Sequence, residues 1–346
     1  MDSPAGGAAR RSLRWIRPVG LLLLSLVCAW IIVGLIGTVD WGAVWDAMSR
    51  VSLWQVPVLL VVLATRQVLN ASPLAFFIEG LGVRRAVQND QAAILTSTIA
   101  PPPADLVLRV AMFGSWDVPA AQGIAGAMMN TITFYVIRFS VPVVGVLLLL
   151  GTAVPYYAIY GWSATLGGAV AVTLLGALWA VLRRERAATW IGTTAGSLVA
   201  RVRSSVDPEA WATSAVAFRA HVVRRSKSGL PASLATLLAM VVVDGLLLSL
   251  CLRSVGVPVA QLSTIAVVGV FLTAYPLTLF PLSGLGVLDA TVLAAFVDTA
   301  GLDLEPDLVA GLVVYRVTTL LVPMVFGLVS IAWWRRTAGS AEMTAE

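Results

Sequence analysis

The stretch "FPLSGLGVLD", residues 280–289, places a proline, two glycines and an aspartate inside a long apolar run. Proline removes a backbone donor and glycine adopts turn conformations readily, so the pattern predicts that one helix ends and another begins at Pro281, Gly284 and Gly286. Asp289 follows directly on the second helix. In a membrane, such a break is tolerated only against protein or a wet cavity.

The composition of the whole chain places this stretch in a bilayer. Of 346 residues, 59% are hydrophobic and 12% are charged, whereas an ordinary soluble domain has about 25% charged residues. Apolar runs of roughly 20 residues, enough to cross the hydrocarbon core, recur from end to end. We therefore expect one integral membrane domain over residues 1–346, with spans at 18–38, 53–78, 120–151, 162–182, 230–252 and 308–333.

Two further apolar segments, 91–113 and 259–297, contain helix breakers. The first is interrupted by Pro101, Pro102 and Pro103, and the second contains the stretch quoted above. Limbs of about 10 residues reach only about the bilayer midplane. Both segments are therefore predicted to be re-entrant hairpins, although the earlier limb of the second is long enough to span.

The order of span, span, hairpin, span occurs twice, which predicts two halves, 18–151 and 162–333, of opposite orientation. "YVIRFSVPVVG" (135–145) is similar to "VYRVTTLLVPMVFG" (314–327), and each places an arginine before Val-Pro and glycine. Residues 183–229 are expected to connect the halves as an amphipathic helix at the cytoplasmic face. The predicted fold is an all-α polytopic membrane bundle with two re-entrant hairpins in an inverted repeat.

Positive charge is distributed unevenly along the chain. Basic residues cluster at the N-terminus, at 84–85, between 183 and 227, and at 335–336. The positive-inside rule then predicts a multi-pass protein of the cell membrane with both termini cytoplasmic. This bias accounts for the net charge of +5, so we expect no nucleic-acid partner.

Charged residues within the apolar segments are costly, at about 2.5–3.5 kcal/mol each near the bilayer centre. Mutual pairing is one explanation: Asp105 and Arg109 are four residues apart, and Asp244 and Asp289 could pair with Arg316 and Arg138. Four arginines against three aspartates, however, leave a positive excess suited to a phosphate. The candidate substrate-binding residues are Arg66, Arg109, Arg138, Asp244, Asp289 and Arg316.

Three stretches carry a resemblance to the lysylphosphatidylglycerol synthetase transmembrane (flippase-like) family. "FPLSGLGVLDATVLAAF" (280–296) resembles its hairpin motif, "TIAPPPADLVLRVAMF" (98–113) is similar to its earlier hairpin, and "VVYRVTTLLVPMVFG" (313–327) resembles its last span. The match covers nearly the whole chain, with Arg109, Asp289 and Arg316 at the family's positions. Leu288 and Asp289 stand where the family motif has Arg-Glu, and Ala104 stands where a glycine usually precedes the acid.

The resemblance implies a membrane transporter that flips an anionic phospholipid or a polyprenyl-phosphate-linked lipid between leaflets. Two other classes stay open: a non-catalytic scaffold for lipid or cell-envelope biosynthesis enzymes, and an intramembrane transferase with Asp105 or Asp289 as base. Catalytic, metal and phosphate-loop motifs are absent, and the single histidine, His221, lies in the connecting segment, so we expect neither an enzyme nor a cofactor. The chain ends soon after its last span, and we expect no aminoacyl-transferring domain.

Overall fold

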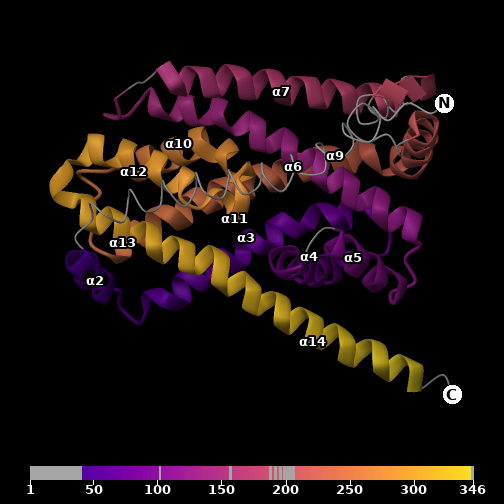
Figure 1. Cartoon of the computed structure of the whole chain (residues 1–346), viewed down its shortest axis with the longest axis horizontal. Helices are drawn as coiled ribbons and strands as arrows, with labels where there is room; N and C mark the ends of the chain where they lie inside the picture. Colours follow the sequence, from indigo (N-terminus) through magenta and orange to yellow (C-terminus); the bar gives the residue numbers. More distant parts are fainter. Residues whose placement is uncertain are drawn as a thin grey trace, which may run out of the picture.

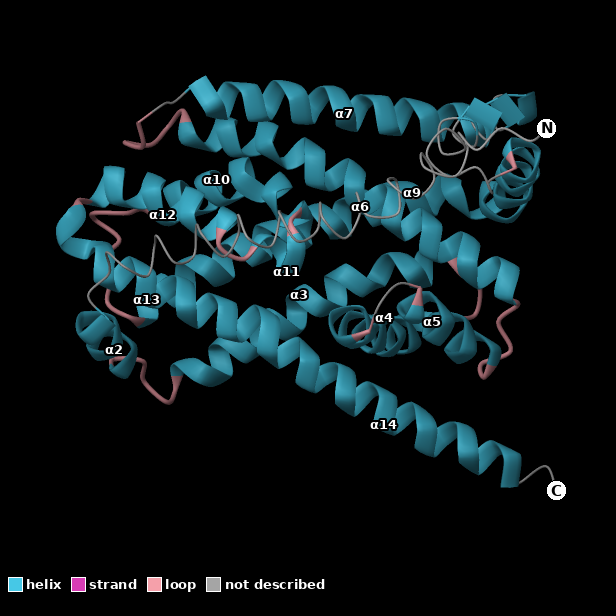
Figure 2. Ribbon diagram, viewed as in Figure 1, coloured by secondary structure: helices cyan, strands magenta, loops and turns pink. Residues whose placement is uncertain are grey.

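The computed structural model describes residues 41–100, 103–155, 158–186, 189–190, 193–194, 197 and 207–343. These residues form helices joined by short loops, and no strand occurs among them (Figure 2). The prediction of an all-α polytopic bundle is confirmed. The predicted span 18–38 and the hairpin residues Pro101 and Pro102 lie outside the described residues.

The helices follow one another in a fixed order along the chain (Figure 1). They are α2 (Trp41–Ser49), α3 (Gln55–Phe77), α4 (Gly82–Ile99), α5 (Ala104–Gly114), α6 (Ala120–Leu149), α7 (Ala158–Arg183), α9 (Pro208–Ser254), α10 (Thr264–Ala274), η1 (Tyr275–Leu279), α11 (Pro281–Gly284), α12 (Val287–Ala300), η2 (Leu302–Leu304), α13 (Glu305–Arg316), η3 (Val317–Leu321) and α14 (Val322–Met343).

Six helical stretches of the described chain are long and apolar enough to cross a membrane. Five of them agree with predicted spans: Gln55–Phe77, Ala120–Leu149, Ala158–Arg183, Ser228–Ser254 and Leu302–Thr337. The sixth, Pro281–Ala300, reaches this length only when α11 is counted with α12. Large apolar side chains on α3, α6, α7 and α14 are exposed, as expected for helices that face lipid.

The first helix break lies between α4 and α5. Ala100 is extended because a residue before proline avoids the helical region, and α5 then begins after Pro103. The two helices pack against each other. The limb before the break is longer than predicted, since α4 starts at Gly82 and is roughly 27 Å long. Whether the pair re-enters one side of a membrane stays a prediction.

The second break lies between η1 and α12, where four residues have positive φ. Gly284 and Gly286 adopt φ of 76° and 85°, and the non-glycine residues Leu282 and Ser283 adopt 51° and 57°. A Cβ at Gly284 would lie 2.6 Å from the Leu277 carbonyl oxygen, so the chain is also too tight there for a side chain. The break is therefore where Pro281, Gly284 and Gly286 predicted it, and α10 and α12 pack together on either side.

The predicted connecting segment is partly described. Its second part belongs to α9, which begins at Pro208 and runs to Ser254 as one helical element. Asp207 caps this helix by accepting a hydrogen bond from the Glu209 backbone N–H, and Pro208 occupies the first turn, where its missing donor costs nothing. Residues 208–229 therefore form an extension of the following span and have no boundary of their own.

Each helix pair around a break packs against a long helix from the other half of the chain. α10 lies on α6, and α4 lies on α14. Both contacts are close at a glycine: a Cβ at Gly145 would lie 2.7 Å from the Gly269 carbonyl oxygen, and one at Gly327 would lie 2.7 Å from the Gln91 carbonyl oxygen. Along the long axis of the molecule, α10 and α12 lie toward one end and α4 and α5 toward the other (Figure 1).

Exposed tryptophans mark both ends of the helical bundle. Trp41 and Trp45 belong to α2 and Trp54 directly precedes α3, whereas Trp333 lies in the C-terminal half of α14. These two regions are at opposite ends of the long axis (Figure 1). Tryptophan favours the membrane–water interface, so the two groups are consistent with a bundle that spans a bilayer.

Candidate functional site

A cavity of about 590 Å³ lies where both helix breaks and the long helices meet. Five of the six candidate residues line it: Arg66, Arg109, Arg138, Asp244 and Arg316. The sixth, Asp289, lies behind Arg316 and holds its guanidinium. The charges that the sequence distributes over some 250 positions are thus brought together in one place.

Asp244 on α9 is the acceptor of two partners. Arg66 on α3 donates from Nη2 to one carboxylate oxygen at 3.2 Å, and the Tyr315 hydroxyl donates to the other at 3.1 Å. Arg66 also donates to the Gln67 side-chain oxygen at 2.5 Å. Asp244 is only 3% exposed, and both of its oxygens are satisfied by protein.

Asp90 on α4 forms the second polar cluster, and the sequence interpretation missed it. Arg109 donates from Nη2 to Asp90 at 2.8 Å and from Nη1 to Asn89 at 2.9 Å. Asn70 donates to the other oxygen of Asp90 at 2.7 Å. The structure therefore pairs Arg109 with Asp90, which comes from the preceding helix, and not with Asp105.

Arg316, at the end of α13, forms the third cluster with the second break. Its Nε donates to Asp289 at 2.7 Å, and its Nη1 donates to the Ser283 carbonyl oxygen at 3.3 Å. The other oxygen of Asp289 accepts the Gly286 backbone N–H at 2.9 Å, which caps α12. The buried Nη2 of Arg316 has no partner among the described residues.

Arg138 on α6 differs from the other three arginines. Its guanidinium lies over the rings of Phe134 and Tyr135, at 4.5 Å and 5.4 Å from their centroids. No carboxylate within the described residues pairs with it, and its buried Nε has no hydrogen-bond partner there. The expected pairs of Asp244 and Asp289 with Arg316 and Arg138 are thus replaced by pairs with Arg66 and Arg316.

A protein-family model covers all the residues that make these contacts. The family model described as Lysylphosphatidylglycerol synthase TM region matches residues 19–327, which is most of the chain. The chain belongs to this family. No curated protein matches the chain.

The match to the lysylphosphatidylglycerol synthase TM region family covers both helix breaks and every residue that lines the cavity. The resemblance read from the hairpin stretches and the last span is confirmed. The description names a transmembrane region, in agreement with the six membrane-length stretches.

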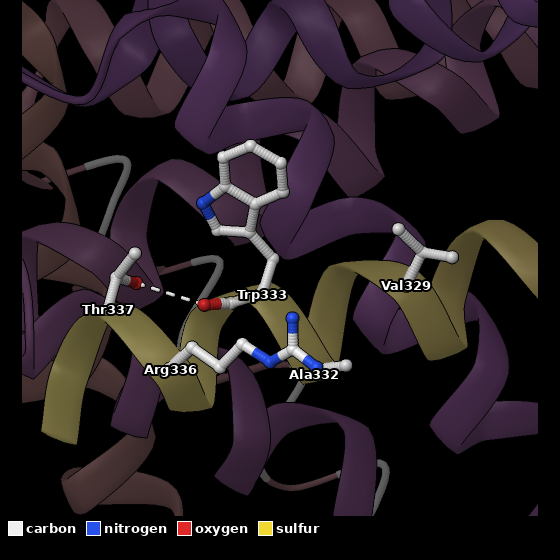
Figure 3. Close-up of a pocket in the computed structure, with 5 residues that line it drawn as sticks. All are labelled: Val329, Ala332, Trp333, Arg336 and Thr337. Carbon is white, nitrogen blue, oxygen red and sulfur yellow. Dashed lines mark hydrogen bonds between the residues drawn. The ribbon is translucent and has the colours of Figure 1, made fainter.

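A second hollow lies along α14 and shares no lining residue with the larger cavity (Figure 3). It is lined by Val329, Ala332, Trp333, Arg336 and Thr337, all from this one helix. The Thr337 hydroxyl donates to the Trp333 carbonyl oxygen, so this hydroxyl is bonded within its own helix. This shallow surface lacks the converging polar groups of the larger cavity, which is the candidate site.

Among the residues that the structure describes, no group of three or more His, Cys, Asp or Glu side chains is arranged to hold a metal ion. Four arginines and two aspartates, Asp90 and Asp244, line the cavity together with amide and hydroxyl groups, and the excess of guanidinium groups suits an anion.

Proposed function

We propose that the protein moves an anionic phospholipid or a polyprenyl-phosphate-linked lipid between the two leaflets, with the phosphate bound in the cavity by Arg138 and Arg316. The observation that carries the proposal is the unpaired guanidinium of Arg138. Three arginines of the cavity have an aspartate partner, whereas Arg138 has only two aromatic rings. The described part of the site thus has one cation in excess.

An excess cation inside a membrane domain is costly unless a ligand neutralises it. A phosphate is suited to this role because guanidinium groups grip it through two parallel hydrogen bonds. Arg316 lines the same cavity as Arg138, and its buried Nη2 is a donor without a partner among the described residues. These groups support an anionic headgroup as the guest.

The remaining lining supports a guest with an apolar part. Phe134, Leu320, Leu321 and Met324 line the cavity beside the polar clusters. The volume lies within the range of about 300–1,000 Å³ that is common for small-molecule sites. Such a mixed surface suits an amphiphile, with the headgroup at the arginines and the first part of its tail beside the aromatic and aliphatic side chains.

The packing of the two halves supports movement of this guest across the membrane. Gly145 and Gly327 each follow an arginine and a Val-Pro pair in their half, and each packs closely on the first helix of the other half's break. This correspondence favours the predicted inverted repeat, in which one repeat rocks against the other around a site near the midplane.

The test is lipid translocation by the purified protein in phosphatidylcholine vesicles that contain a fluorescent anionic lipid. Dithionite reduces only the label in the outer leaflet. The rate at which labelled lipid of the inner leaflet becomes accessible to dithionite therefore reports translocation. We expect the parent protein to translocate and Arg138→Gln to lose at least roughly tenfold in rate. Arg183→Gln is the matched control, because Arg183 also lies over an aromatic ring, that of Trp179, at 4.7 Å but outside the cavity.

Three results would contradict the proposal. Absence of translocation by the well-folded parent protein would favour a scaffold, and a covalently changed lipid in the mass spectrum would favour a transferase. Equal loss in the Arg183 control would show that the cavity has no special part in translocation.

A further inference from the structure

The tip of the second helix break, residues 281–286, is a wall of the cavity as well as a turn. Leu282 and Ser283 line the cavity, and Leu282 is 54% exposed. Both adopt left-handed backbone conformations, which side chains with a Cβ disfavour by roughly tenfold per residue. Glycines would occupy these positions without strain, so hydrogen bonds must hold the tip in this form. Two of them lie within the turn: the Gly284 N–H donates to the Phe280 carbonyl oxygen at 3.0 Å, and the Leu285 N–H donates to the Leu282 carbonyl oxygen at 3.3 Å.

One hydrogen bond connects this tip directly to the proposed phosphate site. Arg316 donates from Nη1 to the Ser283 carbonyl oxygen at 3.3 Å, a long and therefore weak bond. Its Nε is held separately by Asp289, and its buried Nη2 is unpartnered. A phosphate that binds in the forked manner takes Nη1 and Nη2 together, so it competes with the Ser283 carbonyl for Nη1 and requires the buried Nη2 to be uncovered.

We propose that residues 281–286 form a ligand-released latch, which Arg316 holds closed through the Ser283 carbonyl until a phosphate takes the Nη1–Nη2 edge. Release removes the restraint that Arg316 places on the tip and leaves its local bonds, such as that from the Gly284 N–H to the Phe280 carbonyl oxygen at 3.0 Å, so the strained tip moves more readily away from the cavity. Asp289 keeps Nε throughout, so the guanidinium stays in place while its outer edge changes partner. This inference rests on the proposed function, because it needs a phosphate ligand, and it adds the coupling between binding and movement.

The experiment follows the reactivity of a cysteine at position 282 toward a water-soluble maleimide. The background is the full chain with Cys28 and Cys251 replaced by alanine, in nanodiscs of phosphatidylcholine with or without phosphatidylglycerol. We expect the anionic lipid to raise the labelling rate of Leu282→Cys by about fivefold, as one kcal/mol of coupling would do. Thermal stabilisation by the anionic lipid, measured on the same samples, reports binding independently.

Two variants of Ser283 separate the effect of backbone strain from the effect of the serine hydroxyl. Ser283→Gly removes the strain and keeps the carbonyl, so the tip stays closed and the lipid-dependent increase in labelling falls below about twofold while thermal stabilisation persists. Ser283→Ala keeps the Cβ and the strain, and it should respond as the parent does. Equal responses of these two variants would overturn the latch.

The remaining outcomes distinguish the latch from the proposed function. If the anionic lipid stabilises the protein in a manner that requires Arg138 but never changes the labelling of position 282, the latch is wrong and the phosphate site stands. If the lipid changes neither stability nor labelling in the folded protein, the phosphate site and the latch both fail.

Discussion

Arg138 and Arg316 occupy corresponding places in the sequence, but their replacement by methionine should have opposite consequences for stability. Arg138 has no carboxylate partner, so Arg138→Met loses two cation–π contacts of roughly 0.5–1 kcal/mol each and removes an uncompensated charge. We expect its melting temperature to be unchanged or higher. Arg316→Met leaves Asp289, whose side chain is only 13% exposed, without its cation.

Removing one partner of a buried pair costs about 3–5 kcal/mol. At about 2.1 cal/mol/K per residue, a chain of 346 residues shifts by roughly 1.4 °C per kcal/mol, so Arg316→Met should melt about 4–7 °C below the parent. Both variants should lose translocation by at least roughly tenfold, about 1.4 kcal/mol in the limiting step. Thermal unfolding in detergent and the vesicle assay measure the two quantities on the same preparations.

The separation between stability and transport is the critical result. A fall in melting temperature for Arg138→Met as large as that for Arg316→Met would mean that Arg138 is a structural ion-pair residue. Arg138→Lys adds a control, because it keeps the charge and loses the fork, and it should transport at a rate between those of the parent and the methionine variant.

Three further predictions concern the architecture. Asp90→Asn and Arg109→Gln should each destabilise the protein by about 3 kcal/mol. In a thermal double-mutant cycle, the double variant should lose about 1–3 kcal/mol less than the sum of the two single effects. Full additivity would argue against the ion pair. Gly327→Ala should lower stability by roughly 1–3 kcal/mol because its Cβ has no space against α4, and a neutral effect would contradict this packing. If α4 and α5 form a re-entrant hairpin, cysteines at Arg85 and Asp117 should react with an impermeant reagent from the same side, whereas opposite sides would mean that the segment spans.

The membrane spans and both helix breaks could be predicted from sequence because their causes are local. A bilayer requires about 20 apolar residues per crossing, and proline and glycine interrupt a helix wherever they stand. Pro103, Pro281, Gly284 and Gly286 therefore mark the breaks correctly. The limb before the first break is longer than the apolar run predicts, because α4 continues through the polar residues that precede Gln91.

The polar partners could not be predicted in the same way because they depend on packing between distant helices. Asp90 stands in the polar run Gln-Asn-Asp-Gln, which resembles a surface turn, but the packing of α4 against α3, α5 and α14 buries it. Arg66 meets Asp244 across 178 positions. Spacing within one helix suggested Asp105 for Arg109, but the structure brings a carboxylate from the neighbouring helix instead.

The π-helical turn η3, Val317–Leu321, sits directly after Arg316 and before Pro323. A π turn accommodates one more residue than an α turn, and each residue of an α-helix corresponds to about 100° of rotation. The turn therefore sets the angular register between α13 and α14: Arg316 can face the cavity while Gly327, farther along, faces α4. Deleting a single residue from this turn would rotate either Arg316 away from the cavity or Gly327 away from α4. The π turn thus allows one continuous helical segment to serve both the ligand site and the packing of the bundle.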